Sequence, residues 1–171
     1  GRGKNNENIA YGVVTDGGDA WVVASGSPSN PVTEKRIPKA DVESEQKGTV
    51  FTFHLRDNAV WHDGHKFDAG DALFSWQLFK NPDVDCDEIR STFDNIVFGE
   101  KLDDYTVRYF YKEQYYAALN VFSLDFPILP SHLYNLLDPD NKDYNPKASL
   151  AQQGTYINDN PHNEKWVGLG P

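Results

Sequence analysis

The chain has 171 residues, of which 39% are hydrophobic and 13% aromatic, and its formal net charge is −10. This length fits one domain, or one domain with an added subdomain, and the apolar content is enough to build a core. The 16 basic residues are scattered among 26 acidic ones. The sequence therefore lacks the Lys/Arg stripe that nucleic-acid binding requires.

Cysteine content and targeting signals narrow the class further. Cys86 is the single cysteine, so no disulfide forms within the chain. No apolar run approaches the roughly 20 residues of a membrane helix, and no signal-peptide core is recognisable. The chain opens at Gly1 and contains no Met. We therefore expect a processed protein, or a piece excised from a longer polypeptide.

Residues 1–48 predict a lead-in of short strands and loops. Residues 1–8 are polar and suggest a loose start, and residues 21–24 read as a short strand after a glycine turn. Residues 25–31 are rich in Gly, Ser, Pro and Asn and predict a loop, and residues 32–37 predict a second strand.

The clearest local pattern is a strand, a tight turn and a capped helix. In residues 50–56, Phe51 and Phe53 alternate with polar residues, which places one face of a strand on the core. A glycine turn follows at residues 61–64. Asp68 then begins a helix with Asp71 three residues later, which is the spacing of a capping box with Asp in place of Glu.

This helix is apolar on two sides. Four apolar residues share one face at helical spacing: Ala72, Leu73, Trp76 and Phe79. At about 100° per residue, Phe74 and Leu78 lie roughly opposite Trp76. Both apolar faces of such a helix are expected to be buried. The group that covers the second face is another subdomain, a partner or a ligand.

The remaining elements predict the fold class. Residues 95–98 and 105–111 read as a hairpin joined across 99–104, and residues 114–122, 130–134 and 148–153 read as helices. Hairpins interleaved with helices predict an α+β fold with a mixed, largely antiparallel sheet and flanking helices.

Four stretches in order along the chain carry a family pattern. The first contains Phe53, Leu55, Arg56, Trp61, Asp63, Gly64, Phe67, Ala69, Asp71, Phe74 and Ser75. The others are residues 103–107, 128–134 and 167–171. This order resembles the extracellular solute-binding proteins, family 5, of peptide- and nickel-type ABC importers. Two positions depart from the pattern: Leu169 replaces the usual Thr, and Gly70 replaces the usual acidic residue.

The resemblance implies a function and a setting. Family members have two lobes that close on a ligand, so residues 49–171 are expected to be a subdomain of the first lobe, a fragment that contributes one wall of the cleft. The implied function is the substrate-binding component of an ABC importer for oligopeptides or dipeptides. We expect no catalysis and no cofactor, a monomer, and a peptide or other small solute and permease subunits as partners. The expected location is periplasmic or extracellular, with membrane association only through an N-terminal anchor, such as a lipid, that this sequence lacks.

The resemblance also suggests ligand-binding residues. It implies that Phe74 faces the cleft, and the helical wheel independently places Phe74 and Leu78 off the main core face. A second layer of core explains Phe74 equally well. Trp61 lines the cleft or, as large aromatic residues more often do, packs the strand–helix junction. The candidate ligand-binding residues are therefore Phe74, Trp61 and Leu78.

Two other classes of function remain as alternatives. His62 and His65, with Asp63 and Asp68 nearby, suggest a metal-dependent hydrolase, but zinc pairs on helices are spaced i, i+4 and no further ligand cluster follows. We therefore expect no metal site and no catalytic residue. The second alternative is a non-transport interaction domain on the same fold, which docks another protein through the Phe74/Leu78 face.

Overall fold

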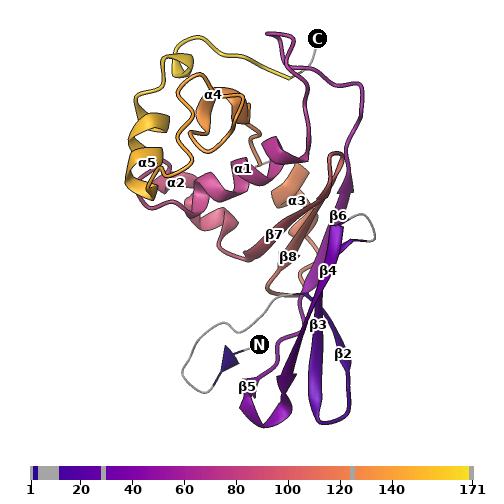
Figure 1. Ribbon diagram of the computed structural model, residues 1–171. Helices are drawn as coiled ribbons and strands as arrows, with labels where there is room; N and C mark the ends of the chain where they lie inside the picture. The colour runs from indigo at the N-terminus through magenta and orange to yellow at the C-terminus, as the bar shows by residue number, and fades with distance from the viewer. Residues whose placement is uncertain (1, 4–11, 28–29, 124–125, 170–171) are drawn as a thin grey trace.

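The computed structural model describes residues 2–3, 12–27, 30–123 and 126–169. Figure 1 shows a narrow sheet of β2, β3 and β4 that projects from a larger part of the molecule. In the larger part, helix α1 packs against strands β7 and β8 and against helix α4. Among the described residues, each helix is too short or too polar to cross a bilayer.

The projecting sheet contains three antiparallel strands: β2 (Val13–Asp16), β3 (Ala20–Ser27) and β4 (Asn30–Pro38). The predicted strands at 21–24 and 32–37 are confirmed within β3 and β4. The predicted loop at 25–31 is wrong at both ends, because cross-strand pairing carries β3 and β4 as far as Ser27 and Asn30. Residues 28–29 lie outside the described residues.

Two further short strands form a separate two-stranded sheet. Strand β1 (Arg2–Gly3) pairs with β5 (Val42–Ser44), and the 3-10 helix η1 (Lys39–Asp41) connects β4 to β5. The prediction of a loose start at 1–8 is wrong at Arg2–Gly3, which form a strand. The rest of that stretch, residue 1 and residues 4–8, lies outside the described residues.

The main sheet has the order β6–β8–β7, with β6 (Thr49–His54), β7 (Ile96–Asp103) and β8 (Thr106–Tyr111). The strand predicted at 50–56 is confirmed, although it ends at His54. The hairpin is also confirmed, but its connection is shorter than predicted. Pairing of β7 with β8 continues to Asp103 and Thr106, with two register shifts on the way. The turn is closed by the Tyr105 amide, which donates to Asp103 Oδ1 at 2.8 Å.

Helix α1 (Ala69–Lys80) begins as predicted. Asp68 is its N-cap, and the side chains of Asp68 and Asp71 form both halves of a capping box. The two-sided burial is confirmed as well, because Phe74 and Leu78 are as buried as Ala72 and Trp76. Phe74 and Leu78 share one hydrophobic cluster with Tyr134 and Ile157. In the described chain, the second cover of α1 is therefore supplied by this chain's own C-terminal segment.

An aromatic cluster fills the space between the main sheet and the helices. The ring of Phe122, on α3 (Ala118–Ser123), lies 5.1 Å from both Phe51 and Phe53 and 5.3 Å from Tyr109. The helix predicted at 114–122 starts late, because the Ala118 amide first closes a turn onto the Tyr115 carbonyl at 3.1 Å. These contacts fix α3 to the open face of β6 and β8.

Shorter helices complete the larger part: α2 (Asp87–Arg90), η2 (Ser91–Phe93), α4 (Ser131–Tyr134), α5 (Leu150–Asn158) and η3 (Pro161–Asn163). The prediction for 130–134 is confirmed as α4. The helix predicted at 148–153 begins two residues later and runs on to Asn158. Ser149 caps it, with Gln152 as the reciprocal partner.

Between α4 and α5 the chain folds as a series of Asx turns. Four side chains each accept a hydrogen bond from the amide two residues later: Asn135, Asp138, Asn141 and Asn145. The backbone carbonyl of each also accepts from the amide three residues later. This segment therefore satisfies its backbone groups locally, without a helix or a sheet.

The turn before α1 predicts a backbone-specific effect of substitution. Gly64 has φ 89°, and a Cβ there would meet open space, so Gly64→Ala should destabilise the fold by about 1 kcal/mol through the left-handed backbone alone. Gly64→Asn should cost less, because Asn tolerates this region. Urea unfolding of both variants measures the difference. Equal stability of Gly64→Ala and the wild type would contradict the assignment.

Candidate functional site

The first and last family-like stretches meet beside the start of α1. Trp61 pairs with Leu169 in an antiparallel bridge, and the His62 amide donates to the Gly168 carbonyl at 3.0 Å. Trp61 also stacks edge-on against Phe67, with ring centroids 5.9 Å apart. The turn before α1 is thus held between its own helix and a segment from the far end of the chain.

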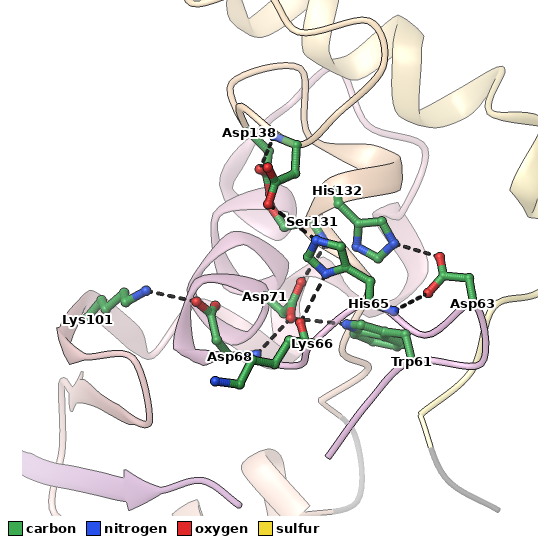
Figure 2. Close-up of polar contacts among 11 residues, drawn as sticks. Trp61, Asp63, His65, Lys66, Asp68, Asp71, Lys101, Ser131, His132 and Asp138 are labelled. Atoms are coloured by element: carbon green, nitrogen blue, oxygen red, sulfur yellow. Dashed lines mark hydrogen bonds and ion pairs between the residues drawn. The ribbon is translucent and has the colours of Figure 1, made fainter. Parts of the chain in front are cut away.

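The carboxylate of Asp71 connects the turn, the helix cap and α4 (Figure 2). Its Oδ2 accepts from Trp61 Nε1 and from the Asp68 amide, each at 3.1 Å, and its Oδ1 accepts from the Ser131 amide at 2.7 Å. Asp71 is only 3% exposed. Burial raises the pKa of this carboxyl above its usual value, although the three hydrogen bonds favour the ionised form.

A second contact joins the segment before α4 to α1. Ser75 Oγ donates to the Asp71 carbonyl at 2.7 Å and accepts from the Leu129 amide at 2.9 Å. Ser75 is 1% exposed. The third family-like stretch, residues 128–134, is therefore anchored to α1 at two successive turns of the helix.

Lys101, which precedes the second family-like stretch, links Asp104 of that stretch to Asp68 at the same helix end. Lys101 Nζ lies 3.0 Å from Asp68 Oδ2 and 2.9 Å from Asp104 Oδ1. The Asp104 carbonyl also accepts from the Ala69 amide, in the first turn of α1, at 2.8 Å. The hydrogen bond from Lys101 lowers the pKa of Asp104. All four stretches thus converge on the N-terminus of α1.

Asp63 is hydrogen-bonded to His132, which connects the turn to α4 (Figure 2). The distance from His132 Nε2 to Asp63 Oδ2 is 2.7 Å, and the His132 side chain is 7% exposed. Asp63 Oδ1 also accepts from the His65 amide at 3.0 Å. Burial acts to raise the pKa of Asp63, but the bonds from His132 and from the His65 amide outweigh it, so the pKa lies below its usual value.

His65 lies flat against His132. The ring centroids are 3.8 Å apart and the planes differ by 14°. The His65 ring also contacts the Lys66 carbonyl through Nδ1 at 3.1 Å and Asp140 Oδ2 through Nε2 at 3.3 Å. Both histidines are therefore held by the protein's own groups.

The three residues predicted to bind ligand are all buried. Trp61 is 2% exposed, Phe74 5% and Leu78 6%. Trp61 packs the strand–helix junction with its indole N–H on Asp71, and Phe74 and Leu78 pack in the core cluster. Trp61 thus contacts the polar network at the helix start, whereas Phe74 and Leu78 pack among apolar side chains. Ligand contact at the three positions stays a prediction.

Two hollows of the described surface lie near the C-terminal helices. One, of about 400 Å³, is lined by Leu136, Ala151, Gln152, Thr155 and Tyr156. The other, of about 120 Å³, is lined by His132, Leu133, Asp140, Lys142, Tyr156 and His162. Neither is lined by a predicted ligand-binding residue. Within the described ranges, no group of three or more His, Cys, Asp or Glu residues is arranged to hold a metal ion.

Sequence reasoning missed the Asp63–His132 pair. A usable signal was present, because Asp63 and His132 both stand at defined positions of the family-like stretches. Two such polar residues in separate stretches were candidates for direct contact.

Comparison with known proteins assigns the family. The family model described as bacterial extracellular solute-binding proteins, family 5 Middle, matches residues 32–171. The chain belongs to this family. The match begins within β4, upstream of the boundary predicted at residue 49, and that boundary stays a prediction.

Individual relatives agree with the assignment. The periplasmic oligopeptide-binding protein OppA of Salmonella typhimurium is 34% identical over 111 residues, covering 51% of this chain and 19% of that protein. Two solved structures share the fold. NikZ from Campylobacter jejuni, in complex with Ni(L-His), has a TM-score of 0.54 at 24% identity, over 99% of this chain and 29% of that one. The oligopeptide-binding protein AppA from Bacillus subtilis, in complex with a nonapeptide, has a TM-score of 0.56 at 20% identity, over 88% of this chain and 26% of that one. The chain thus spans less than a third of each relative.

Replacing Asp71 tests the polar junction. In Asp71→Asn, an NH₂ group must face at least one of the three donors, so a buried N–H loses its acceptor. The expected loss is about 1–3 kcal/mol of unfolding free energy, measured by urea denaturation. The exposed Asp85 provides a matched control, Asp85→Asn, which should change stability little. An unaltered midpoint in Asp71→Asn would contradict the role of Asp71.

The lowered pKa of Asp63 predicts a pH dependence. A carboxyl whose pKa is lower in the folded state stabilises the fold above its unfolded value of 3.8, and this contribution disappears as the pH falls through the folded value. The stability advantage of the wild type over Asp63→Asn should therefore shrink as the pH falls below about 5, and continue to shrink below 3.8. The exposed Asp57 supplies the control, Asp57→Asn. A constant gap between wild type and Asp63→Asn would argue against the pair.

Proposed function

We propose that this chain is part of the substrate-binding component of an ABC importer, and that the complete receptor binds oligopeptides or dipeptides. The observation that carries the proposal is the family match over residues 32–171. In this proposal the chain contributes one wall of the ligand cleft. Solute and permease subunits are its partners, and the protein works in the periplasm or outside the cell.

The choice of peptides as the solute is supported by two relatives. The Salmonella relative is named as an oligopeptide-binding protein, and the Bacillus structure contains a nonapeptide. The Campylobacter structure contains Ni(L-His) instead. A nickel–histidine complex is therefore the natural competing ligand in any binding experiment.

The contacts of the polar residues support a binding role without catalysis. The His132 imidazole is bound to Asp63, and His65 contacts Asp140. Ser131 Oγ accepts from Asn135 Nδ2 at 3.2 Å. Burial raises the pKa of the Cys86 thiol, which disfavours the nucleophilic thiolate. The two histidines and Ser131 are thus each bound to a different side chain of the fold, and the Cys86 thiolate is disfavoured, which supports a role without an activated nucleophile.

The burial and polar contacts of α1 support the proposal that this chain forms one wall of the ligand cleft. Its N-terminus is held by polar contacts from Trp61, from the Asp104 carbonyl and from Ser131, and both of its sides are buried. A wall of this kind presents a fixed surface and contributes only part of the contacts that enclose a ligand. High affinity then depends on the remainder of a complete receptor.

Isothermal titration tests the proposed function. A complete receptor containing this sequence should bind a mixture of di- to nonapeptides. The 171-residue chain alone should bind at least about a hundredfold more weakly, because one wall of the cleft supplies only part of the contacts with the ligand. Titration with nickel–histidine is the competing arm. Tight nickel–histidine binding with no peptide binding would contradict the peptide assignment, and hydrolysis of the peptides would contradict a purely binding role.

A variant of Phe74 tests the predicted ligand contact. If Phe74 touches the peptide, Phe74→Leu in the complete receptor should weaken binding by about tenfold or more. Phe93 is fully buried in the same core cluster, so Phe93→Leu is the matched control that should lower stability alone. Unchanged affinity in Phe74→Leu, with lower stability, would assign Phe74 to the core.

A further inference from the structure

The two hollows of the C-terminal part adjoin at one side chain. Both lie between α5 and the segments around it (Figure 1). The larger hollow, of about 400 Å³, has Leu136 and Ala151 in its lining, whereas the smaller one, of about 120 Å³, is lined mainly by polar side chains. Tyr156 lines both hollows. A ligand with an apolar part and a polar part can therefore occupy both at once.

Tyr156, the shared wall, is fixed by the Asx-turn segment. Its Oη lies 3.1 Å from Asn141 Oδ1 and 3.0 Å from Asp143 Oδ2. Asn141 Oδ1 also accepts from the Asp143 amide at 2.9 Å, and Asn141 is only 4% exposed. The wall is thus in place before any ligand arrives, which lowers the ordering cost of binding.

The smaller hollow has charged side chains of both signs. Lys142 Nζ lies 3.8 Å from Asp143 Oδ2, but the two side chains are 73% and 50% exposed, and such a surface pair is weak. The Lys142 ammonium can therefore pair with a carboxylate of a ligand. Asp140 contacts His65 at 3.3 Å through one oxygen. A carboxylate accepts several hydrogen bonds, so Asp140 can also pair with an ammonium group.

Two buried polar atoms beside this hollow lack a partner. Within the part of the chain that the structure describes, the buried side-chain atoms without a hydrogen bond are His132 Nδ1 and Asn141 Nδ2. His132 lines the smaller hollow, and Asn141 stands between the lining residues Asp140 and Lys142. Buried atoms of this kind are costly unless a bound molecule completes their hydrogen bonding. A ligand with both donors and acceptors, together with water that enters with it, can pair with both.

Size and net charge select the ligand class. A volume of about 120 Å³ holds about four water molecules, which suits the ammonium, Cα and carboxylate of one amino acid. The chain has a net charge of −10, which disfavours a simple anion. Lys142 disfavours a simple cation. A zwitterion has no net charge and avoids both penalties.

We propose that the two hollows form one site for a free apolar α-amino acid such as leucine. Its carboxylate pairs with Lys142, and its ammonium group pairs with Asp140. Its side chain enters the larger hollow beside Leu136 and Ala151, on the other side of Tyr156. This site does not depend on the proposed peptide cleft, so either can exist without the other.

Nuclear magnetic resonance titration of the 171-residue chain tests the site. L-Leucine should shift the Tyr156 and Asn141 resonances saturably, with a dissociation constant of about a millimolar or lower. Glycine, which lacks the apolar side chain, should bind at least about tenfold more weakly. Leucinamide and N-acetyl-leucine each lose one charge and should each bind at least about threefold more weakly. A leucine-containing dipeptide distinguishes the end of a peptide from a free amino acid, and it should also bind more weakly.

Variants assign each part of the ligand to its hollow. Lys142→Met should weaken leucine binding about threefold or more and remove the preference for leucine over leucinamide. Ala151, which is exposed on α5, can be replaced without opening the core. Ala151→Trp fills the larger hollow, so leucine should bind no better than glycine. The exposed Lys147 supplies the matched control, and Lys147→Met should bind leucine as the wild type does.

Three results would overturn the site. The first is the absence of saturable shifts with leucine in the folded chain, which would mean that the hollows hold only water. The second is equal affinity for leucine, leucinamide and N-acetyl-leucine. The third is unchanged leucine binding in Lys142→Met. Each of these results leaves the peptide-binding proposal intact, because that proposal is tested on the complete receptor with peptides.

Discussion

The buried carboxylate of Asp71 is the constraint on which the larger part of the molecule depends. A negative charge with 3% exposure is costly unless donors surround it. Its donors come from the turn and the helix cap, which are 10 and 3 residues away in the sequence, and from α4, which is 60 residues away. Satisfying one side chain therefore requires all three segments to be in position at once, which couples local folding to tertiary packing.

The family assignment gives this junction a wider meaning. The four stretches that resemble the family are those that meet at the N-terminus of α1. Their residue types thus have a structural explanation in this chain: Trp61 donates to Asp71, Asp63 binds His132, and residues 167–169 pair with the turn. The pattern that identifies the family here therefore coincides with residues that assemble this polar junction, and contact with solute is a separate question.

Local signals in the sequence were sufficient for part of the fold. The capping box of α1 and the alternation in β6 are encoded within a few residues, and both are present as predicted. Boundaries set by distant partners were not predictable in this way. Strands β3 and β4 extend into a stretch rich in turn-forming residues because each pairs with the other, and β7 extends to Asp103 because β8 continues beside it. Of the polar site, Asp71 was recognisable as the start of a helix. Its contacts with Ser131 and Trp61, and the pairing of Asp63 with His132, depend on tertiary structure that one sequence does not display.

The bridge between Trp61 and Leu169 has a topological consequence. Two segments far apart in the sequence run side by side in opposite directions, so the chain between them forms a closed circuit that begins and ends at the same place. Polypeptide arranged in this way can be accommodated as an insertion within a host fold, because its two attachment points are already adjacent. Changes in length inside the circuit would have to keep both this antiparallel pairing and the pairing of β8, which lies inside the circuit, with β6, which lies outside it.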